Sequence, residues 1–274
     1  MPFTQANFQN ELGQALAASN ERLMFDKASV SGLVAGGLAT TWRLTGVPTQ
    51  GAIPGAAAIC NKATTGSFPF ANEAGGLQNY VAWAYYAAGN AGQSFELRDR
   101  LAHMGGLSGT VTTAQAANID LGTLGISAAR RGAADYSEVL WFLEWYTTTG
   151  GTGVNATVNV TYDDASTGNI VIAIPASTAA SRAIQILPGV AGRNIKGVNN
   201  VTLSATTGTA GSFGVTASTA LTSFENDVAG KGKDHSWSLL GIPRVIDDSC
   251  LFGVLPQAST TTGTLRGQFK LAKV

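Results

Sequence analysis

Side chains that enzymes use for acid–base or nucleophilic chemistry are few and far apart in this sequence. Only two histidines occur, His103 and His235. A serine or cysteine nucleophile needs a base within hydrogen-bonding reach, so such a site would have to use one of them. His235 follows Asp234, which leaves a Ser-His-Asp site open, whereas His103 follows a strand pattern and fits a turn or a subunit contact. We predict no catalytic residue and no enzymatic activity.

Two adjacent carboxylate pairs, Asp163–Asp164 and Asp247–Asp248, are the next candidates for chemistry. A glycosidase needs two carboxyl groups facing each other across a cleft, but neighbouring residues of a strand point to opposite faces. The first pair falls in a turn, where aspartate is favoured for its hydrogen bonds to the backbone. For the second pair we expect a salt bridge to Arg244 or to a neighbouring subunit.

Patterns for metals, phosphates and sugars are weak. The segment 163–169 has oxygen ligands and a glycine but not the spacing of an EF-hand, which leaves only a loose calcium loop open. The segment 230–233 lacks the Lys-Ser/Thr pair of a phosphate loop. Trp141 and Trp145 share one strand face, as in a sugar platform, although a stripe facing the core is favoured. We predict no metal and no cofactor.

The composition favours a protein surface that is covered by neighbours. Charged residues make up 12% of the chain, compared with about 25% in globular proteins. The 17 Lys and Arg balance the 17 Asp and Glu, and a net charge of zero gives a free monomer little colloidal repulsion. The basic residues are scattered, so we expect no nucleic-acid partner, and the close pairs Arg130–Arg131 and Lys231/Lys233 are interpreted as solvated or interface charges.

The two cysteines and the hydropathy pattern indicate a protein made in a reducing compartment. Cys60 and Cys250 match neither a zinc pattern nor a disulfide framework, and two buried thiols are favoured over one disulfide. No signal-peptide pattern opens the chain, and no apolar run of about 18 residues occurs. We therefore expect no membrane partner.

The run 138–215 has the clearest structural pattern. An apolar stretch at 139–146 is followed by a loop, and then Ala156, Val158, Val160 and Tyr162 alternate with Asn and Thr. Such alternation predicts a strand with one apolar and one uncharged polar face. The turn 163–169 leads to a returning strand at 170–174. Further strands are expected near 183–187, 201–204, 213–216, 237–240, 250–255 and 265–271.

The N-terminal part has a different pattern. Thr4 is a helix cap, and Phe8, Leu12 and Leu16 lie on one side of an amphipathic helix predicted over 4–26. Residues 30–77 are rich in Gly, Ala and Thr and predict an extended arm with a short strand at 40–45. The segments 80–86 and 94–101 predict a hairpin around a turn at 88–92, with a helix as the alternative for 94–101.

These elements together predict a mainly β protein with a β-sandwich or jelly-roll-like body. We expect the aromatic faces of 80–86 and 139–146 to be buried together between the sheets. The predicted organisation is an N-terminal helix and extended arm over 1–75, followed by the sandwich body with its closing strands over 76–274.

Several segments resemble a family of tailed-bacteriophage virion proteins. They include LRDRLAHMGGLSGTVTTAQ at 97–115, LEWYTTTG at 143–150 and GIPRVIDDSCL at 241–251, with further matches at 42–46, 50–60, 158–162 and 201–211. The resemblance spans residues 40–274, and its motifs are structural rather than chemical. It implies a structural protein located in the virion and made in the bacterial host cytoplasm, with no catalytic positions to carry over.

Three roles follow as expectations. The first is a capsid-associated decoration or stabilising protein, acting as a homo-oligomer such as a trimer and contacting the major capsid protein or other virion proteins. The second is a neck or tail protein, such as a collar or fibre-attachment subunit. The third is a glycan-binding adhesion module that uses Trp141 or Trp145.

Overall fold

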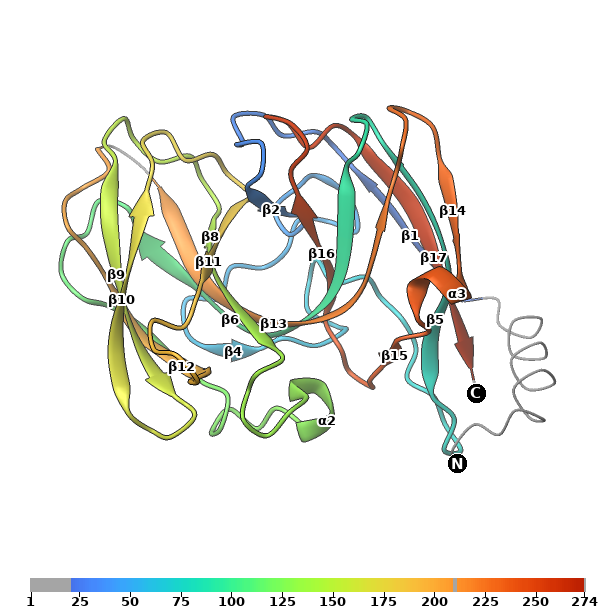
Figure 1. Ribbon diagram of the computed structural model, residues 1–274, viewed down its shortest axis with the longest axis horizontal. Helices are drawn as coiled ribbons and strands as arrows, with labels where there is room; N and C mark the ends of the chain where they lie inside the picture. Colours follow the sequence, from blue (N-terminus) through green and yellow to red (C-terminus); the bar gives the residue numbers. More distant parts are fainter. Residues whose placement is uncertain (1–20, 209–210, 274) are drawn as a thin grey trace.

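The computed structural model describes residues 21–208 and 211–273, which fold into antiparallel sheets (Figure 1). The mainly β prediction is confirmed. Within this range the two helices are single turns, α2 (Ala128–Arg131) and α3 (Trp237–Leu240). No helix among the described residues is both long and apolar enough to cross a membrane.

The central sheet closes on itself as a ring of six antiparallel strands. Their order is β6, β13, β8, β11, β2, β16 and back to β6. The bounds are β2 (Leu38–Thr40), β6 (Ser94–Ser108), β8 (Val139–Trp145), β11 (Arg182–Ile186), β13 (Ser212–Glu225) and β16 (Leu251–Pro256), with β4 (Ala58–Ile59) added to β6. Because the ring is closed, these six strands have neighbours on both sides.

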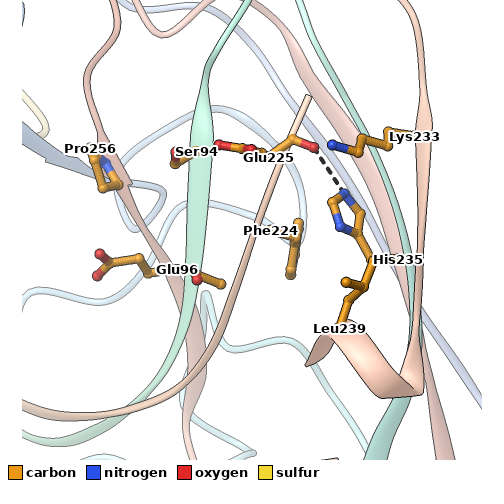
Figure 2. Close-up of a pocket in the computed structure, with 9 residues that line it drawn as sticks. Ser94, Glu96, Phe224, Glu225, Lys233, His235, Leu239 and Pro256 are labelled. Carbon is orange, nitrogen blue, oxygen red and sulfur yellow. Dashed lines mark hydrogen bonds between the residues drawn. The ribbon is translucent and has the colours of Figure 1, made fainter. Parts of the chain in front are cut away.

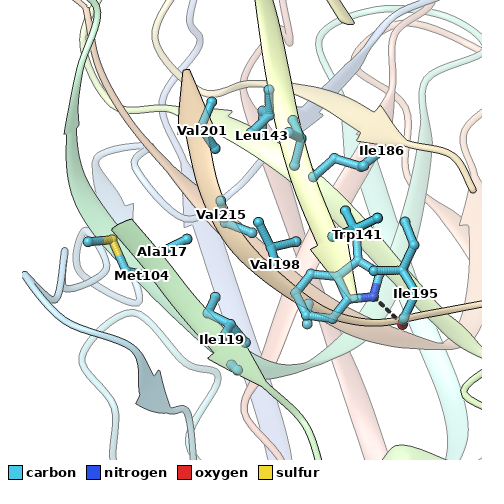
Figure 3. Close-up of a cluster of buried hydrophobic side chains, with 14 of the residues drawn as sticks. Met104, Ala117, Ile119, Trp141, Leu143, Ile186, Ile195, Val198, Val201 and Val215 are labelled. Carbon is cyan, nitrogen blue, oxygen red and sulfur yellow. Dashed lines mark hydrogen bonds between the residues drawn. The ribbon is translucent and has the colours of Figure 1, made fainter. Parts of the chain in front are cut away.

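A second sheet, here the β9 sheet, covers one end of the ring. Its order is β10 (Thr167–Ile174), β9 (Val154–Tyr162), β12 (Ile195–Leu203) and β7 (Gln115–Asp120). The alternation predicted for β9 places Ala156, Val158 and Val160 inward, where they are fully buried. They pack against β8 and β13 in a cluster that contains Trp141, whose indole N–H donates to the carbonyl of Ile195 at 2.9 Å (Figure 3).

A third sheet, here the β5 sheet, lies at the other end of the molecule (Figure 1). Its order is β14 (Lys233–Ser236), β5 (Asn79–Ala88), β17 (Leu265–Lys273), β1 (Arg22–Lys27) and β3 (Gly46–Val47), with β15 (Arg244–Val245) also on β5. Aromatic rings fill the space between this sheet and the ring. The Phe95 ring stacks on Phe224 at 4.9 Å and lies 5.0 Å from Phe25. Aromatic pairs add about 0.5–1.5 kcal/mol each beyond their buried area.

The strands β6 and β13 run through both hydrophobic clusters. Their ladder extends from Ser212↔Ser108 to Glu225↔Ser94, with three register shifts that let the pair bend. Leu107 and Phe213 lie in the cluster beneath the β9 sheet, whereas Phe95 and Phe224 lie in the cluster beneath the β5 sheet. One ladder therefore joins the two cores.

The strands predicted over 138–215 are confirmed as β8 to β13, and the strand interpretation of 94–101 is confirmed over its helix alternative. The predicted hairpin is wrong, because β5 pairs with β14, β15 and β17 while β6 pairs with β4, β13 and β16. Tyr86 and Phe95 instead pack edge to face between two sheets, with ring centroids 5.7 Å apart. The aromatic side chains of β5 and β8 also fall in different clusters, so their predicted joint burial is wrong.

The predicted N-terminal helix lies mostly outside the described residues, and its last part is wrong. Residues 22–26 belong to β1, because Leu23, Phe25 and Lys27 alternate inward with period two. The strand predicted at 40–45 is shorter and earlier, as β2. A boundary at residue 75 stays a prediction, and the ladders β1–β17 and β2–β16 would both cross it.

Candidate functional site

A buried ion pair occupies the interior of the ring. Arg100 of β6 donates from Nη2 to both carboxylate oxygens of Glu144 of β8, at 3.0 and 2.8 Å. Thr216 of β13 joins the two, since it accepts from Arg100 Nη1 at 3.0 Å and donates to Glu144 at 2.9 Å, and Thr40 of β2 donates to the other oxygen. These residues come from four strands of the ring, and both charged side chains are completely buried.

The Arg100 guanidinium also stacks on aromatic rings. Its central carbon lies 4.0 Å from the Trp42 ring centroid and 4.5 Å from that of Phe252. Desolvated cation–π contacts of this kind contribute about 2 kcal/mol. The charge is therefore compensated by a carboxylate in the plane of the guanidinium and by π-faces against it.

A second buried ion pair joins α2 to the ring. Asp99 accepts from Arg130 Nε at 2.8 Å and from Nη2 at 2.7 Å, and it also accepts from Ser249 Oγ and the backbone N–H of Cys250. Arg130 is buried, so its interpretation as a solvated or interface charge is wrong. Burial, the largest single effect, lowers the pKa of Arg130, but the hydrogen bond to Asp99 and the negative charge of Asp99 act together with the nearby thiols to raise it overall.

His103 lies inside the same interior and not in the predicted turn. It belongs to β6, is fully buried, and its Nε2 forms a short hydrogen bond with the Tyr146 hydroxyl. Burial, together with the Arg100 and Arg43 charges, lowers the pKa of His103 well below its ordinary value. The imidazole is neutral at physiological pH and forms part of the packed interior.

Cys60 and Cys250 are both free and buried, which confirms the thiol prediction. They lie in one cluster with Trp42 and Phe252. A hydrogen bond from Cys250 lowers the pKa of Cys60, while burial raises the pKa of Cys250 well above its ordinary value. Neither side chain is open to a substrate.

The interior cluster therefore has the residue types of an active site but no entry for a reactant. Arg100, Glu144, His103 and both thiols are at most 2% exposed. Buried charge pairs of this geometry hold elements in one arrangement, because leaving either partner unpaired costs about 3–5 kcal/mol. Their role in this fold is to tie the ring strands together and to dock α2.

His235 lines an open groove of about 400 Å³ between the β6–β13 ladder and β14 (Figure 2). Its Nε2 donates to the carbonyl of Glu225 at 2.9 Å, and burial lowers its pKa. Asp234 is exposed on the opposite face of β14. No hydrogen bond among the described residues joins His235 to Ser94 or another hydroxyl, so a Ser-His-Asp site is not assembled here.

Both aspartate pairs have structural partners. Asp164 accepts from the backbone N–H and the hydroxyl of Ser166, at 3.0 and 2.6 Å, which confirms the turn interpretation. Its other partner is Arg193, at 2.6 Å. Asp248 pairs with Lys62 at 3.9 Å and accepts from Asn72 at 3.0 Å, so the predicted bridge to Arg244 is not formed.

The two tryptophans considered for sugar binding face the core, as favoured from the sequence. Trp141 and Trp145 are each 1% exposed, which removes them as a sugar platform. The aromatic pair at the outer face of the β5 sheet is Trp83 and Tyr85, whose rings stack at 6.5 Å and remain half-buried. Sequence reasoning did not distinguish these pairs, because the spacings i, i+4 for Trp141 and Trp145 and i, i+2 for Trp83 and Tyr85 each place two aromatics on one face of a strand.

The outer face of the β9 sheet is uncharged and mainly polar along β9, β10 and the C-terminal part of β12. We call it the Asn/Thr face; its members are Asn155, Thr157, Asn159 and Thr161 of β9, Thr167, Asn169, Val171 and Ala173 of β10, and Asn200 and Thr202 of β12. Neighbours are hydrogen-bonded, since Asn159 donates to Asn169 at 2.7 Å and Asn199 donates to Asn159 at 2.8 Å. The predicted alternation is confirmed, and these hydrogen bonds join side chains of β9, β10 and β12.

The sequence reasoning missed the central pair, Arg100 and Glu144. A signal was present, because Glu144 interrupts an otherwise apolar strand-length run and Arg100 is the last of three consecutive charged residues between Leu97 and Leu101. A charge in a strand that is buried on both faces has to be paired. The sequence does not name its partner, since the two lie 44 residues apart.

Comparison with known proteins gives no family. No protein-family model and no curated protein matches the chain. The crystal structure of the infectious bursal disease virus VP2 subviral particle aligns at 10% identity with a TM-score of 0.15, covering 93% of this chain and 81% of that chain. Particles derived from infectious bursal virus align at 11% identity with a TM-score of 0.14, covering 93% and 78%. At these TM-scores the alignments carry no inference about function.

Proposed function

We propose that this chain is a non-enzymatic structural subunit of a tailed-bacteriophage virion, positioned on the capsid as a decoration or stabilising protein. The proposal rests on the sequence resemblance over 40–274 and on the Asn/Thr face, which is the observation that carries it. A hydrogen-bonded surface of Asn and Thr offers donors and acceptors to a neighbouring protein without the desolvation cost of charge.

The interior of the ring supports the same role. Its charged groups form ion pairs that join the strands to one another and to α2, and they do not line a site that opens to solvent. A subunit of a particle needs a body that presents fixed surfaces, and a buried ion pair that is hydrogen-bonded to two further strands favours one arrangement of the ring strands. The described pockets contain no assembled nucleophile–base pair, so a binding surface fits this body better than a catalytic site does.

Purified particles provide the first test. Peptides of this chain should be present in virions purified by density gradient at a fixed ratio to the major capsid protein, and they should be absent from a host lysate fraction without particles. A chain that stays in the soluble fraction while particles form normally would contradict a virion role. Imaging of particles labelled at the C-terminus then separates a capsid position from the neck or tail alternative.

The Asn/Thr face can be tested with a matched pair of variants. Thr157→Lys places a charge in the middle of the face, whereas Ala134→Lys places the same charge on the exposed loop after α2. We expect Thr157→Lys to lower incorporation into particles by about tenfold and to leave the melting temperature within a few degrees, while Ala134→Lys is incorporated normally. Equal incorporation of both variants would show that this face does not contact the particle.

A further inference from the structure

The strand β10 has an open edge. It pairs with β9 on one side and with no other strand among the described residues. The Tyr162 N–H donates to the carbonyl of Ser166 at 2.8 Å, which fixes the alternation of hydrogen bonds along β10. Every second residue of β10, counted from Ser166, therefore points its backbone N–H and C=O toward β9. The backbone groups that point away from β9 are those of Thr167, Asn169, Val171 and Ala173. None of these outward N–H or C=O groups has a backbone partner in the described part of the chain.

This edge lacks the features that normally prevent strand addition. Natural edge strands are kept short, charged, bulged or interrupted by proline. The β10 strand has eight residues, carries no charge or proline, and keeps a continuous register with β9 from Thr167↔Thr161 to Ile174↔Val154. Other described edges are protected: β14 is short and contains Lys233 and Asp234, β3 has two residues, and β7 is bulged against β12.

Apolar side chains lie beside the open edge. Val171 is 64% exposed on the outer face, and Ile170 and Ile172 are only partly buried on the inner one. The loop between β11 and β12 lies against Ile170 at Gly189 and adds the exposed side chains of Leu187 and Val190. A backbone edge bordered by apolar groups on both faces is suited to a protein strand and not to solvent.

We propose that β10 pairs antiparallel with β10 of a second copy of this chain about a two-fold axis. With the axis at Ile170, Asn169 of one copy lies opposite Val171 of the other, and Thr167 lies opposite Ala173. Each outward N–H then meets an outward C=O, so the contact is isologous and leaves no outward group of the four residues unpaired. The two Asn/Thr faces become one continuous face across both copies.

For two copies of this chain, the charge distribution favours the antiparallel arrangement over a parallel one. The charged end of the β9–β10 hairpin carries Asp163, Asp164 and Arg193. Antiparallel pairing places this end beside residues 175–178 of the other copy, which are uncharged, whereas parallel pairing would bring the two acidic turns together. The first described strand, β1, lies at the opposite end of the molecule from β10 (Figure 1).

A proline substitution on the outward-facing register tests the pairing directly. Val171→Pro removes an N–H that points away from β9 and therefore spares the β9 ladder. Val171→Thr keeps the N–H and the strand preference and serves as the matched control. Asn169→Lys adds a charge near the two-fold axis and serves as a second variant if the proline affects folding. Molar mass is measured by light scattering or sedimentation over a range of concentrations, with circular dichroism and thermal melting as folding controls.

We expect the wild type and Val171→Thr to associate, and Val171→Pro and Asn169→Lys to raise the dissociation constant by tenfold or more with unchanged melting. A wild type that remains monomeric at all concentrations would overturn the pairing, as would association that neither variant weakens or that depends only on residues 1–20. The β10–β10 contact deepens the proposed virion role, and its location between subunits of a particle rests on that proposed function. Association of the purified chain and its presence in purified particles are separate measurements, so either proposal can fail without the other.

Discussion

Arg100 and Glu144 are joined by two hydrogen bonds across the interior of a closed ring of strands, with both side chains removed from solvent. A pair in this setting adds little net stability relative to well-packed apolar residues, but breaking it is costly. The stability of the ring therefore depends on the ion pair between Arg100 and Glu144 being intact.

Removal of one member should therefore be more destabilising than removal of both. We expect Glu144→Gln or Arg100→Met to lower the free energy of unfolding by about 3–5 kcal/mol, and the double variant to lose clearly less than the sum of the two. Urea titration of the four proteins gives the coupling energy. Asp227→Asn, which breaks the exposed pair with Lys233, is the control and should change stability by at most about 1 kcal/mol. Additive losses would contradict a coupled buried pair.

Acid should destabilise the protein through its histidines. The pKa values of His103 and His235 are lowered, chiefly by burial, so the unfolded chain binds protons that the folded chain does not. The stability due to the neutral forms is complete above about pH 6.5 and falls as pH decreases below that value, by at most about 1.4 kcal/mol per pH unit for each histidine.

The variant His103→Gln isolates the buried histidine, because glutamine can still hydrogen-bond to the Tyr146 hydroxyl. In urea titrations between pH 5 and 7.5, the free energy of unfolding of this variant should rise less steeply with pH than that of the wild type. The difference in slope corresponds to about one proton, whatever the absolute stability of the variant. An unchanged slope would mean that His103 takes up its proton in the folded protein as readily as in the unfolded one.

The thiols of Cys60 and Cys250 should not react with a thiol reagent in the native protein. Both are buried, and the raised pKa of Cys250 keeps it protonated. A chromogenic disulfide reagent should label both cysteines at once in denaturant and only at the rate of structural opening in buffer, because the thiolate is the reactive species. Rapid labelling of native protein at either position would contradict this burial, and single serine variants identify which thiol has reacted.

Deletions at the N-terminus should become strongly destabilising once they extend beyond residue 20. Removal of residues 1–20 leaves β1 intact, whereas removal of 1–30 takes away the strand between β17 and β3 together with buried Leu23 and Phe25. Each of these side chains contributes about 1.5–3 kcal/mol, so the longer deletion should lose several kcal/mol or fail to fold. The shorter deletion should melt within a few degrees of the full chain. A folded 1–30 deletion would show that β1 is dispensable for the body.

Local patterns in the sequence identified most of the strands but not their partners. The strand predicted at 237–240 is wrong, because these residues form the helical turn α3, and residues 22–26 of the predicted helix belong to β1. The alternation in 156–162 identifies β9 and its two faces, because one face is buried and the other meets solvent. The closed ring could not be inferred, since β2 and β16 join residues more than 200 positions apart. The error at 80–101 has the same cause. Adjacent strands with a tight turn favour a hairpin, but here the turn carries the chain from one sheet to another.

The candidate site divides in the same way. The aspartate turn at Asp163–Asp164 is a local feature and was predicted. The pairs Arg100–Glu144 and Asp99–Arg130 depend on tertiary contacts over 44 and 31 residues, which no short motif specifies. Two of their members, Asp99 and Arg100, are consecutive in β6 and point to opposite sides, one toward α2 and the other into the ring.

The shared ladder of β6 and β13 also determines how the molecule should come apart. Residues of these two strands belong to both hydrophobic clusters. Unfolding of either outer sheet would therefore disturb the β6–β13 pairing on which the other cluster also depends. The two ends should consequently melt together in a single calorimetric transition despite their separate cores. A pull applied at one end of the molecule should be transmitted along the ladder to the other end and not absorbed at a hinge.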